Sequence, residues 1–221
     1  MVKTVDLFDF SHSLSGEYLK SFEYPWEALE GIKELIIKIG SSLNKDDYNE
    51  VSENVWIHKT AKITSSASIG APCIIGADTE VRQCAFIRGS ALIGEGCVIG
   101  NSVEVKNAII FDGVQVPHFN YVGDSILGYK SHMGAGSVTS NVRSDKKPVV
   151  IHDRVNGEDT ETGRKKVGAM LGDFVEVGCN SVLNPGTIIG RNSIVYPTSC
   201  ARGVVPANSI YKNNGTIAEK K

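Results

Sequence analysis

A spacing of six residues constrains this chain more than any other feature. From residue 57 to residue 111 an aliphatic or aromatic side chain recurs at every sixth position, and a second series starts at residue 171. An α-helix requires apolar spacings of three and four, and an isolated amphipathic strand alternates for only a few residues. The period therefore predicts an all-β structure of flat strands and corners, in which three sides close a coil of about 18 residues and the coils stack. The two series are Ile57, Ile63, Ile69, Ile75, Val81, Ile87, Ile93, Ile99, Val105 and Phe111, then Leu171, Val177, Leu183, Ile189 and Val195.

The repeat slips between the two series. Ile110 and Val116 hold a spacing of six, and Leu127 and Met133 hold another in a shifted phase. The pattern stops after Asn141 and returns at Gly168. Residues 143–167 are polar and contain Asn156-Gly157, a dipeptide that favours a type I′ hairpin turn. We expect a loop thrown out of the β-helix, which serves either as a binding element or as a solvated insertion without a role.

The remaining segments divide the chain. Residues 1–50 form an N-terminal segment with one amphipathic helix over about 25–42, which we expect to pack on the β-helix or on a neighbouring subunit. Residues 44–54 are polar and are predicted to be a link, and the β-helix should cover 51–210. Residues 1–23 give no clear pattern, and 211–221 read as a frayed tail.

Composition excludes several classes of protein. The 23 Lys and Arg residues against 25 Asp and Glu give a net charge of −2, which argues against nucleic acid or an anionic membrane as the main partner. The chain contains no apolar run of the length that a membrane helix needs, and its first ten residues lack the apolar stretch of a secretory signal. Five cysteines without a C-x-x-C spacing suit reduced thiols, so a cytoplasmic protein is expected.

The polar residues that interrupt the repeat are the candidates for chemistry. They are densest in residues 100–124, where Glu104 and His118 lie 14 positions apart, on neighbouring sides or coils. A carboxylate beside an imidazole can orient a general base and stabilise its charged form. The competing interpretation of a single histidine in a β-helix is a surface side chain without a catalytic role.

Several motifs resemble the acetyltransferase half of the bifunctional enzymes that make UDP-N-acetylglucosamine. The matching stretches are IRG at 87–89, GNSVEVKNA at 100–108, PHFNYVGD at 117–124 and MGAGSVTSN at 133–141, followed by Lys147. The resemblance covers roughly residues 55–205. Within it, the stretch TGRKKVGAMLGD at 162–173 is similar to the archaeal-type branch of the family. It implies a left-handed parallel β-helix with hexapeptide repeats, acetyl-CoA as co-substrate and a homotrimer whose sites are shared between chains.

The resemblance also implies roles for individual residues. His118 would be the general base and Glu104 would orient it, while the backbone N–H of Ala135 would face the oxyanion and Asn141 would position the amine. Fixed cations suit a phosphorylated substrate, and a base with N–H donors suits acyl transfer to an amine. The residues implied to bind the amino-sugar 1-phosphate are Arg88, Lys106, Tyr121, Lys147 and His132, and those implied to contact the coenzyme are Ala135, Cys179 and Arg202.

The sequence departs from the family pattern in ways that leave alternatives. His132 and Val142 replace an Asn and a Tyr near the amino sugar, so glucosamine 1-phosphate and galactosamine 1-phosphate both remain candidates. A uridylyltransferase domain with its Gly-rich loop is absent, which predicts acetyl transfer without nucleotidyl transfer and without a required metal. The alternatives are a non-catalytic sugar-phosphate- or sugar-nucleotide-binding relative, another hexapeptide acyltransferase, and a zinc enzyme built on His118, His132 and either His58 or His152.

Overall fold

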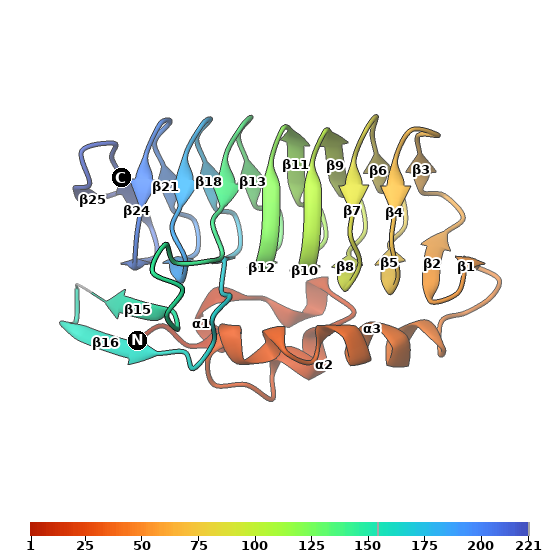
Figure 1. Cartoon of the computed structure of the whole chain (residues 1–221), viewed down its shortest axis with the longest axis horizontal. Coiled ribbons are helices and arrows are strands. Elements are labelled where there is room, and N and C mark those ends of the chain that lie inside the picture. The colour runs from red at the N-terminus through yellow and green to blue at the C-terminus, as the bar shows by residue number, and fades with distance from the viewer. Residues whose placement is uncertain (154, 221) are drawn as a thin grey trace.

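The chain folds as a left-handed parallel β-helix with a layer of short helices along one side. The computed structural model describes residues 1–153 and 155–220. Ile57, Ile75 and Ile93, which lie 18 positions apart in the sequence, are direct neighbours in adjacent coils. Figure 1 shows the coils stacked along the long axis, with the helical segment beneath them. The predicted fold class is therefore confirmed.

Each coil has three sides, which we call face 1, face 2 and face 3 in chain order. The long strands β10 (Glu104–Ile110) and β12 (Tyr121–Leu127) cross the corner from face 3 to face 1 without a break. Face 1 otherwise contains β2 (Val55–His58), β5 (Cys73–Ile75), β8 (Ala91–Ile93), β17 (Ala169–Leu171), β20 (Thr187–Ile189) and β23 (Val204–Val205). Face 2 contains β3 (Lys62–Ile63), β6 (Glu80–Val81), β9 (Val98–Asn101), β11 (Gln115–His118), β13 (His132–Met133), β18 (Glu176–Val177), β21 (Ile194–Val195) and β24 (Ser209–Tyr211). Face 3 otherwise contains β4 (Ser68–Ile69), β7 (Phe86–Ile87), β14 (Val138–Thr139), β19 (Val182–Leu183) and β22 (Cys200–Ala201).

Two consecutive coils are shorter than the rest, which explains the slip in the repeat. Ile110 pairs with Ile93, and Leu127 pairs with Ile110, so each of these coils spans 17 residues between equivalent positions. The interior position is therefore Ile110, and the expectation for Phe111 was wrong by one residue. Phe111 is buried, with its ring 5.2 Å from that of Phe8 in the N-terminal segment.

Face 1 carries a second apolar column that points away from the interior. The residue before each interior position is apolar on this face, and all members of the column are buried. The N-terminal helices and the loop cover this column, which removes its apolar surface from water. The column consists of Ile74, Leu92, Ile109, Ile126, Met170, Ile188 and Val204.

The N-terminal segment is helical but consists of several short pieces. It contains α1 (Thr4–Leu7), α2 (Gly16–Leu19), α3 (Ile32–Gly40) and the 3₁₀ helices η1 (Phe10–His12) and η2 (Pro25–Leu29). The single helix expected over about 25–42 is thus divided near Gly31. Tyr18 donates a hydrogen bond to the carbonyl of Ala28 at 2.7 Å, and a Cβ at Gly31 would lie 2.5 Å from the Tyr18 hydroxyl oxygen. Gly31 therefore lets the backbone pass close to the Tyr18 side chain at the break between η2 and α3.

The link, the loop and the tail each form an antiparallel pair, of which the sequence predicted only the hairpin in the loop. The predicted link contains β1 (Tyr48–Ser52), which pairs antiparallel with β2. In the loop, β15 (Val150–Asp153) pairs with β16 (Glu158–Glu161), but the connection is longer than a two-residue type I′ turn. The expected frayed tail instead forms β25 (Ile217–Glu219), which pairs antiparallel with β24 at the end of the β-helix. No helix of the described residues is long and apolar enough to cross a membrane.

Candidate active site

The candidate residues lie on two different edges of the β-helix. His118, Ala135 and Cys179 share the edge between faces 2 and 3 on three successive coils. Arg88 and Lys106 lie on the edge between faces 3 and 1, where the loop also leaves the coil after Ser140 and returns at Gly168. Face 3 separates the two sets within one chain.

The edge between faces 2 and 3 places an exposed imidazole beside an unpaired backbone donor. The N–H of Gly136 donates to the carbonyl of His118 at 3.0 Å, so Ala135 lies directly under His118 in the next coil. Within residues 1–153 and 155–220 the His118 ring and the Ala135 N–H form no hydrogen bond. His118 is held through its backbone, whose N–H donates to the Asn120 side chain at 3.0 Å. A base and an N–H donor are thus available to a bound substrate at one corner.

The hydrogen bond expected between Glu104 and His118 is not formed. Glu104 accepts a hydrogen bond from Arg88 Nη1 at 2.8 Å, one coil away on face 3. This ion pair is the largest reason that the pKa of Arg88 is raised. Both side chains are partly exposed, so the pair contributes little to folding.

The edge between faces 3 and 1 carries a polar cluster centred on Asp124. This carboxylate is only 4% exposed and accepts hydrogen bonds from Lys106, Asn107 and Asn141. The Lys106 ammonium lies 3.1 Å from Oδ2 of Asp124, and the Asn107 amide lies 2.9 Å from Oδ1. A buried carboxylate with this many donors is a rigid anchor for the side chains around it.

The shortened coils create this cluster. Asn107 and Asp124 occupy the shortened corners with φ of 48° and 49°, a backbone region that Asn and Asp adopt more readily than most residues. Asp124 was not assigned a role from the sequence, although it stands within the polar stretch 100–124 and at the second slip of the repeat. An Asp at a position where the period shortens was the signal available.

Tyr121 and Asn141 extend the cluster toward face 3. The Asn141 side-chain amide donates to the Tyr121 hydroxyl oxygen at 3.1 Å and also to Asp124. Burial is the main cause of the raised pKa of Tyr121, so its hydroxyl keeps its proton and can donate to an anion. Lys106, Tyr121 and Asn141 therefore gather around Asp124, and Arg88 lies on the same edge one coil before Lys106.

Three other candidates lie apart from this cluster within the chain. His132 lies on face 2, where its Nδ1 is 2.8 Å from the Glu176 carboxylate. Lys147 is exposed on the loop, and its backbone N–H donates to Asp145. Cys179 is exposed on the edge that carries His118.

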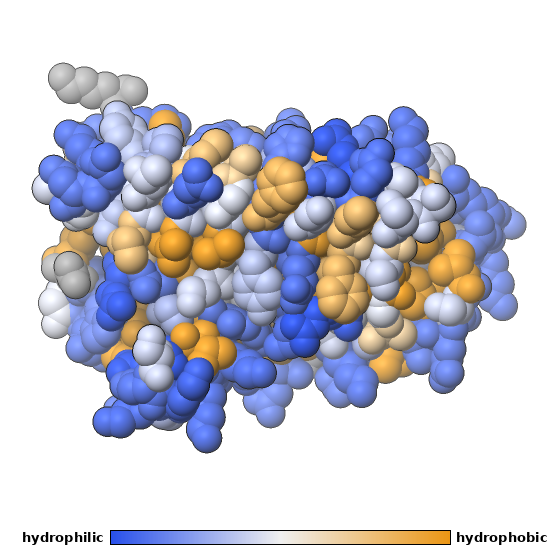
Figure 2. Space-filling view, turned by 45° about the horizontal axis from the view of Figure 1, so that its top comes forward, coloured by the Kyte–Doolittle hydropathy of each residue, from blue (hydrophilic) through white to orange (hydrophobic). Residues whose placement is uncertain are grey.

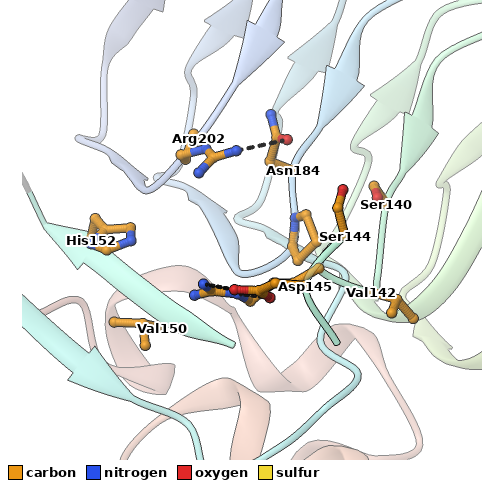
Figure 3. Close-up of a pocket in the computed structure, with 10 residues that line it drawn as sticks. Ser140, Val142, Ser144, Asp145, Val150, His152, Asn184 and Arg202 are labelled. Carbon is orange, nitrogen blue, oxygen red and sulfur yellow. Dashed lines mark hydrogen bonds and ion pairs between the residues drawn. The ribbon is translucent and has the colours of Figure 1, made fainter. Parts of the chain in front are cut away.

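Arg202 lines a cavity of about 320 Å³ between the loop and the β-helix. In Figure 3 the loop residues Asp145, Val150 and His152 face Asn184 and Arg202 across this cavity. The Arg202 guanidinium donates to the Asn184 side chain at 3.4 Å, and Arg143 holds Asp145 at 2.7 and 2.9 Å. The pair with Arg143 is the main cause that lowers the pKa of Asp145 to about 2. We call this space the loop cavity.

No group of three potential metal ligands occurs among residues 1–153 and 155–220. The histidines that a zinc site would need are also dispersed within the chain. His118 lies on the edge between faces 2 and 3, whereas His152 is paired with Asp159 at 2.8 Å on the loop hairpin and His58 contacts Thr60 in the first coil.

The comparisons with known proteins connect these features to one group. A family profile described as the GMPPB C-terminal domain matches residues 78–167. A protein named Bifunctional protein GlmU from Methanococcus maripaludis is 33% identical over 207 residues, which is 92% of this chain and 50% of that protein. This chain is a homologue of the archaeal GlmU-type proteins. It spans about half the length of the GlmU-type relative that it matches over most of its own sequence.

Other relatives match a shorter part of the chain. A Bifunctional sugar-1-phosphate nucleotidylyltransferase/acetyltransferase from Sulfurisphaera tokodaii is 34% identical over 105 residues, which is 48% of this chain and 26% of that protein. Among solved structures, PerB from Caulobacter crescentus in complex with CoA and GDP-perosamine aligns over 73% of this chain and 56% of its own, with 17% identity and a TM-score of 0.39.

Proposed function

We propose that the protein is an acetyl-CoA-dependent N-acetyltransferase that acts on an amino-sugar 1-phosphate. The observation that carries the proposal is the unpaired His118 ring one coil above the unpaired Ala135 N–H. The likeness to GlmU-type proteins over 92% of the chain supports the same conclusion. Glucosamine 1-phosphate and galactosamine 1-phosphate are the candidate substrates.

In the proposed reaction His118 removes a proton from the sugar amine as the amine nitrogen forms a bond to the thioester carbonyl carbon. The Ala135 N–H donates to the oxyanion of the tetrahedral intermediate. As the carbon–sulfur bond breaks, His118 returns the proton to the leaving thiolate, which yields the N-acetyl sugar and free coenzyme A. Arg88, Lys106 and Tyr121 bind the phosphate, while Asn141 positions the amine and Asp124 keeps this cluster in place.

The coenzyme is proposed to contact Ala135 and Cys179 on the edge between faces 2 and 3, and Arg202 at the loop cavity. Support comes from the loop cavity, where Arg202 can offer its charge to a coenzyme phosphate. We further propose a homotrimer, in which His118 of one chain faces the Asp124 cluster of its neighbour. The wide separation of the two edges by face 3 supports a shared site.

Release of free thiol from acetyl-CoA tests the proposal. The protein is incubated with acetyl-CoA and, in separate reactions, with glucosamine, glucosamine 1-phosphate, galactosamine 1-phosphate and glucosamine 6-phosphate. We expect thiol release that depends on one hexosamine 1-phosphate. Release with none of these sugars would contradict the proposal, and binding of a sugar phosphate without release would favour a non-catalytic relative.

A further inference from the structure

The N-terminal segment reaches the Asp124 cluster through one side chain. The 3₁₀ helix η2 ends beside the shortened corners, where the carbonyl of Leu29 accepts a hydrogen bond from the Asn107 side-chain amide at 3.2 Å. The same amide donates to Oδ1 of Asp124 at 2.9 Å. Leu29 and Asn107 lie 78 positions apart in the sequence, so this bridge exists only in the folded protein. Asn107 therefore joins the helical layer to the carboxylate at the centre of the cluster.

The bridge uses the whole donor capacity of the Asn107 amide. A side-chain amide carries two N–H donors, and Leu29 and Asp124 supply one acceptor for each. The main chain of Asn107 is also held, because its N–H donates to the carbonyl of Gly89 in the preceding coil at 3.2 Å. The donors of Asn107 are thus all used within the chain, and its influence on a substrate passes through the residues that it holds.

The loop joins the same junction. Glu30, the residue after η2, accepts a hydrogen bond from Arg164 on the returning strand of the loop at 3.0 Å. Glu30 is exposed, so this ion pair alone is weak. The main chain adds a firmer link, because the N–H of Gly168 donates to the Asp124 carbonyl at 2.7 Å. The end of η2, the shortened corner and the base of the loop are therefore attached to one another.

The position of the Asp124 carboxylate determines where two proposed substrate contacts lie. Lys106 Nζ lies 3.3 Å from Oδ1 and 3.1 Å from Oδ2, and Asn141 donates to Oδ2. Asn107 shares Oδ1 with Lys106, so loss of its amide would let the carboxylate turn toward the remaining donors. Such a turn would move the Lys106 ammonium and the Asn141 amide, which need a fixed geometry to bind and orient a sugar.

We propose that Asn107 is a positioning residue for the bound sugar, and that through it the N-terminal segment is a functional part of the site as well as the cover of face 1. The inference rests on the proposed function, because Lys106 and Asn141 are the residues through which Asn107 acts. Asn107 itself does not touch the sugar.

Titration calorimetry with glucosamine 1-phosphate and galactosamine 1-phosphate tests this role. Coenzyme A is present throughout, since it fills the coenzyme site but has no acetyl group to transfer. Asn107→Gly removes the amide and spares the corner, because glycine adopts φ of 48° without strain. The dissociation constant of the hexosamine 1-phosphate should rise by about threefold to tenfold. Asn107→Asp, which keeps the shape but has no N–H donor, should weaken binding at least as much.

Two controls separate positioning from a loss of folded structure. Titration with coenzyme A alone should give a dissociation constant within about twofold of wild type for Asn107→Gly, because His118 and Ala135 lie across face 3. Asn208→Gly is the matched variant, since Asn208 also has a positive φ, 52°, and lies exposed on the edge between faces 1 and 2. It should leave both dissociation constants unchanged.

The outcomes separate this inference from the proposed function. Sugar affinity within about twofold of wild type in both Asn107 variants would overturn the inference, as would equal weakening of sugar phosphate and coenzyme A, or wild type that binds neither sugar phosphate. Sugar binding weakened in the Asn107 variants alone, without acetyl transfer by wild type, would support the inference and contradict the proposed function. Acetyl transfer by wild type with unchanged sugar affinity in the variants would do the opposite.

Discussion

At the scale of single residues, Asp124 determines how the edge between faces 3 and 1 is built. Its carboxylate is almost fully buried and is bound by one ammonium group and two side-chain amides. The motif that contains it was recognised from the sequence, but its role was not. Repeats predict which residues point inward. The slip of the repeat was visible in the sequence, but the corner at which each coil is shortened follows from the register of the strands.

We expect Asp124→Asn to lower the free energy of unfolding by about 1–3 kcal/mol, because it leaves the partly buried Lys106 ammonium without its counter-charge. Lys106→Met should cost less, because both amide donors still bind the carboxylate. In a double-mutant cycle the two sites should show a coupling of about 1 kcal/mol. Urea denaturation measures all three variants, with the exposed Asp46→Asn as control. A loss below about 0.5 kcal/mol for Asp124→Asn would contradict this role.

The cysteines offer a test of burial. Burial raises the pKa of Cys73 and of Cys97 to about 12, whereas Cys84, Cys179 and Cys200 are exposed. At pH 8 the two buried thiols are then ionised in roughly one molecule in ten thousand, and only thiolates react with iodoacetamide. Mass spectrometry should therefore find three alkylated cysteines in the native protein and five after denaturation. Rapid native alkylation of Cys73 or Cys97 would show that the coil interior is open.

At the scale of elements, the period of six predicted the strands of all three faces but not what covers them. The apolar residue before each interior position, such as Ile74 or Leu92, was visible in the sequence and occurs on face 1 alone as a continuous column. This continuous apolar column predicts that other segments, here the helices and the loop, cover face 1. The hairpin at 217–219 could not be foreseen, because its polar sequence gives no strand pattern and pairing with β24 decides its structure.

Gly100 and Gly96 form a matched pair that tests the stacking of the coils. A Cβ at Gly100 would lie 1.6 Å from the Pro117 carbonyl oxygen in the next coil, whereas at Gly96, with φ of +60°, nothing lies within 4 Å. Gly100→Ala should therefore cost about 3 kcal/mol or more through the clash, and Gly96→Ala about 1–2 kcal/mol through backbone strain. Urea midpoints compare the two, and an equal cost would contradict the close stacking of these coils.

At the scale of the whole molecule, the separation of the two edges points to sites shared between chains. His118 and the Asp124 cluster lie on either side of face 3, which exposes Phe86 at 46% and Val182 at 37%. Figure 2, in which the upper side of Figure 1 comes forward, shows apolar side chains gathered on this side of the molecule. An apolar strip between two halves of a site suits contact with another copy.

Mixing two inactive variants tests the shared site. His118→Ala retains the cation edge and Lys106→Ala retains the base, so a mixed trimer regains one intact site between neighbouring chains. Each mixed trimer of a three-fold ring has one intact site of three, so the purified hybrids should show about a third of the wild-type rate. The rate is measured after co-expression and double-tag purification, with each variant alone as control. Hybrids no faster than the separate variants would place each site within a single chain.

The central claim is that His118 is the general base of acetyl transfer, and the rate of N-acetylated product formation in His118→Ala measures it most directly. Because the ring is exposed and forms no hydrogen bond or ion pair with a described residue, the variant should keep its unfolding midpoint, and His58→Ala serves as the matched control. With a hexosamine 1-phosphate and acetyl-CoA at saturation, mass spectrometry of the sugar should show product formation about 10²–10⁴ times slower than in wild type. A rate equal to that of wild type would contradict the account.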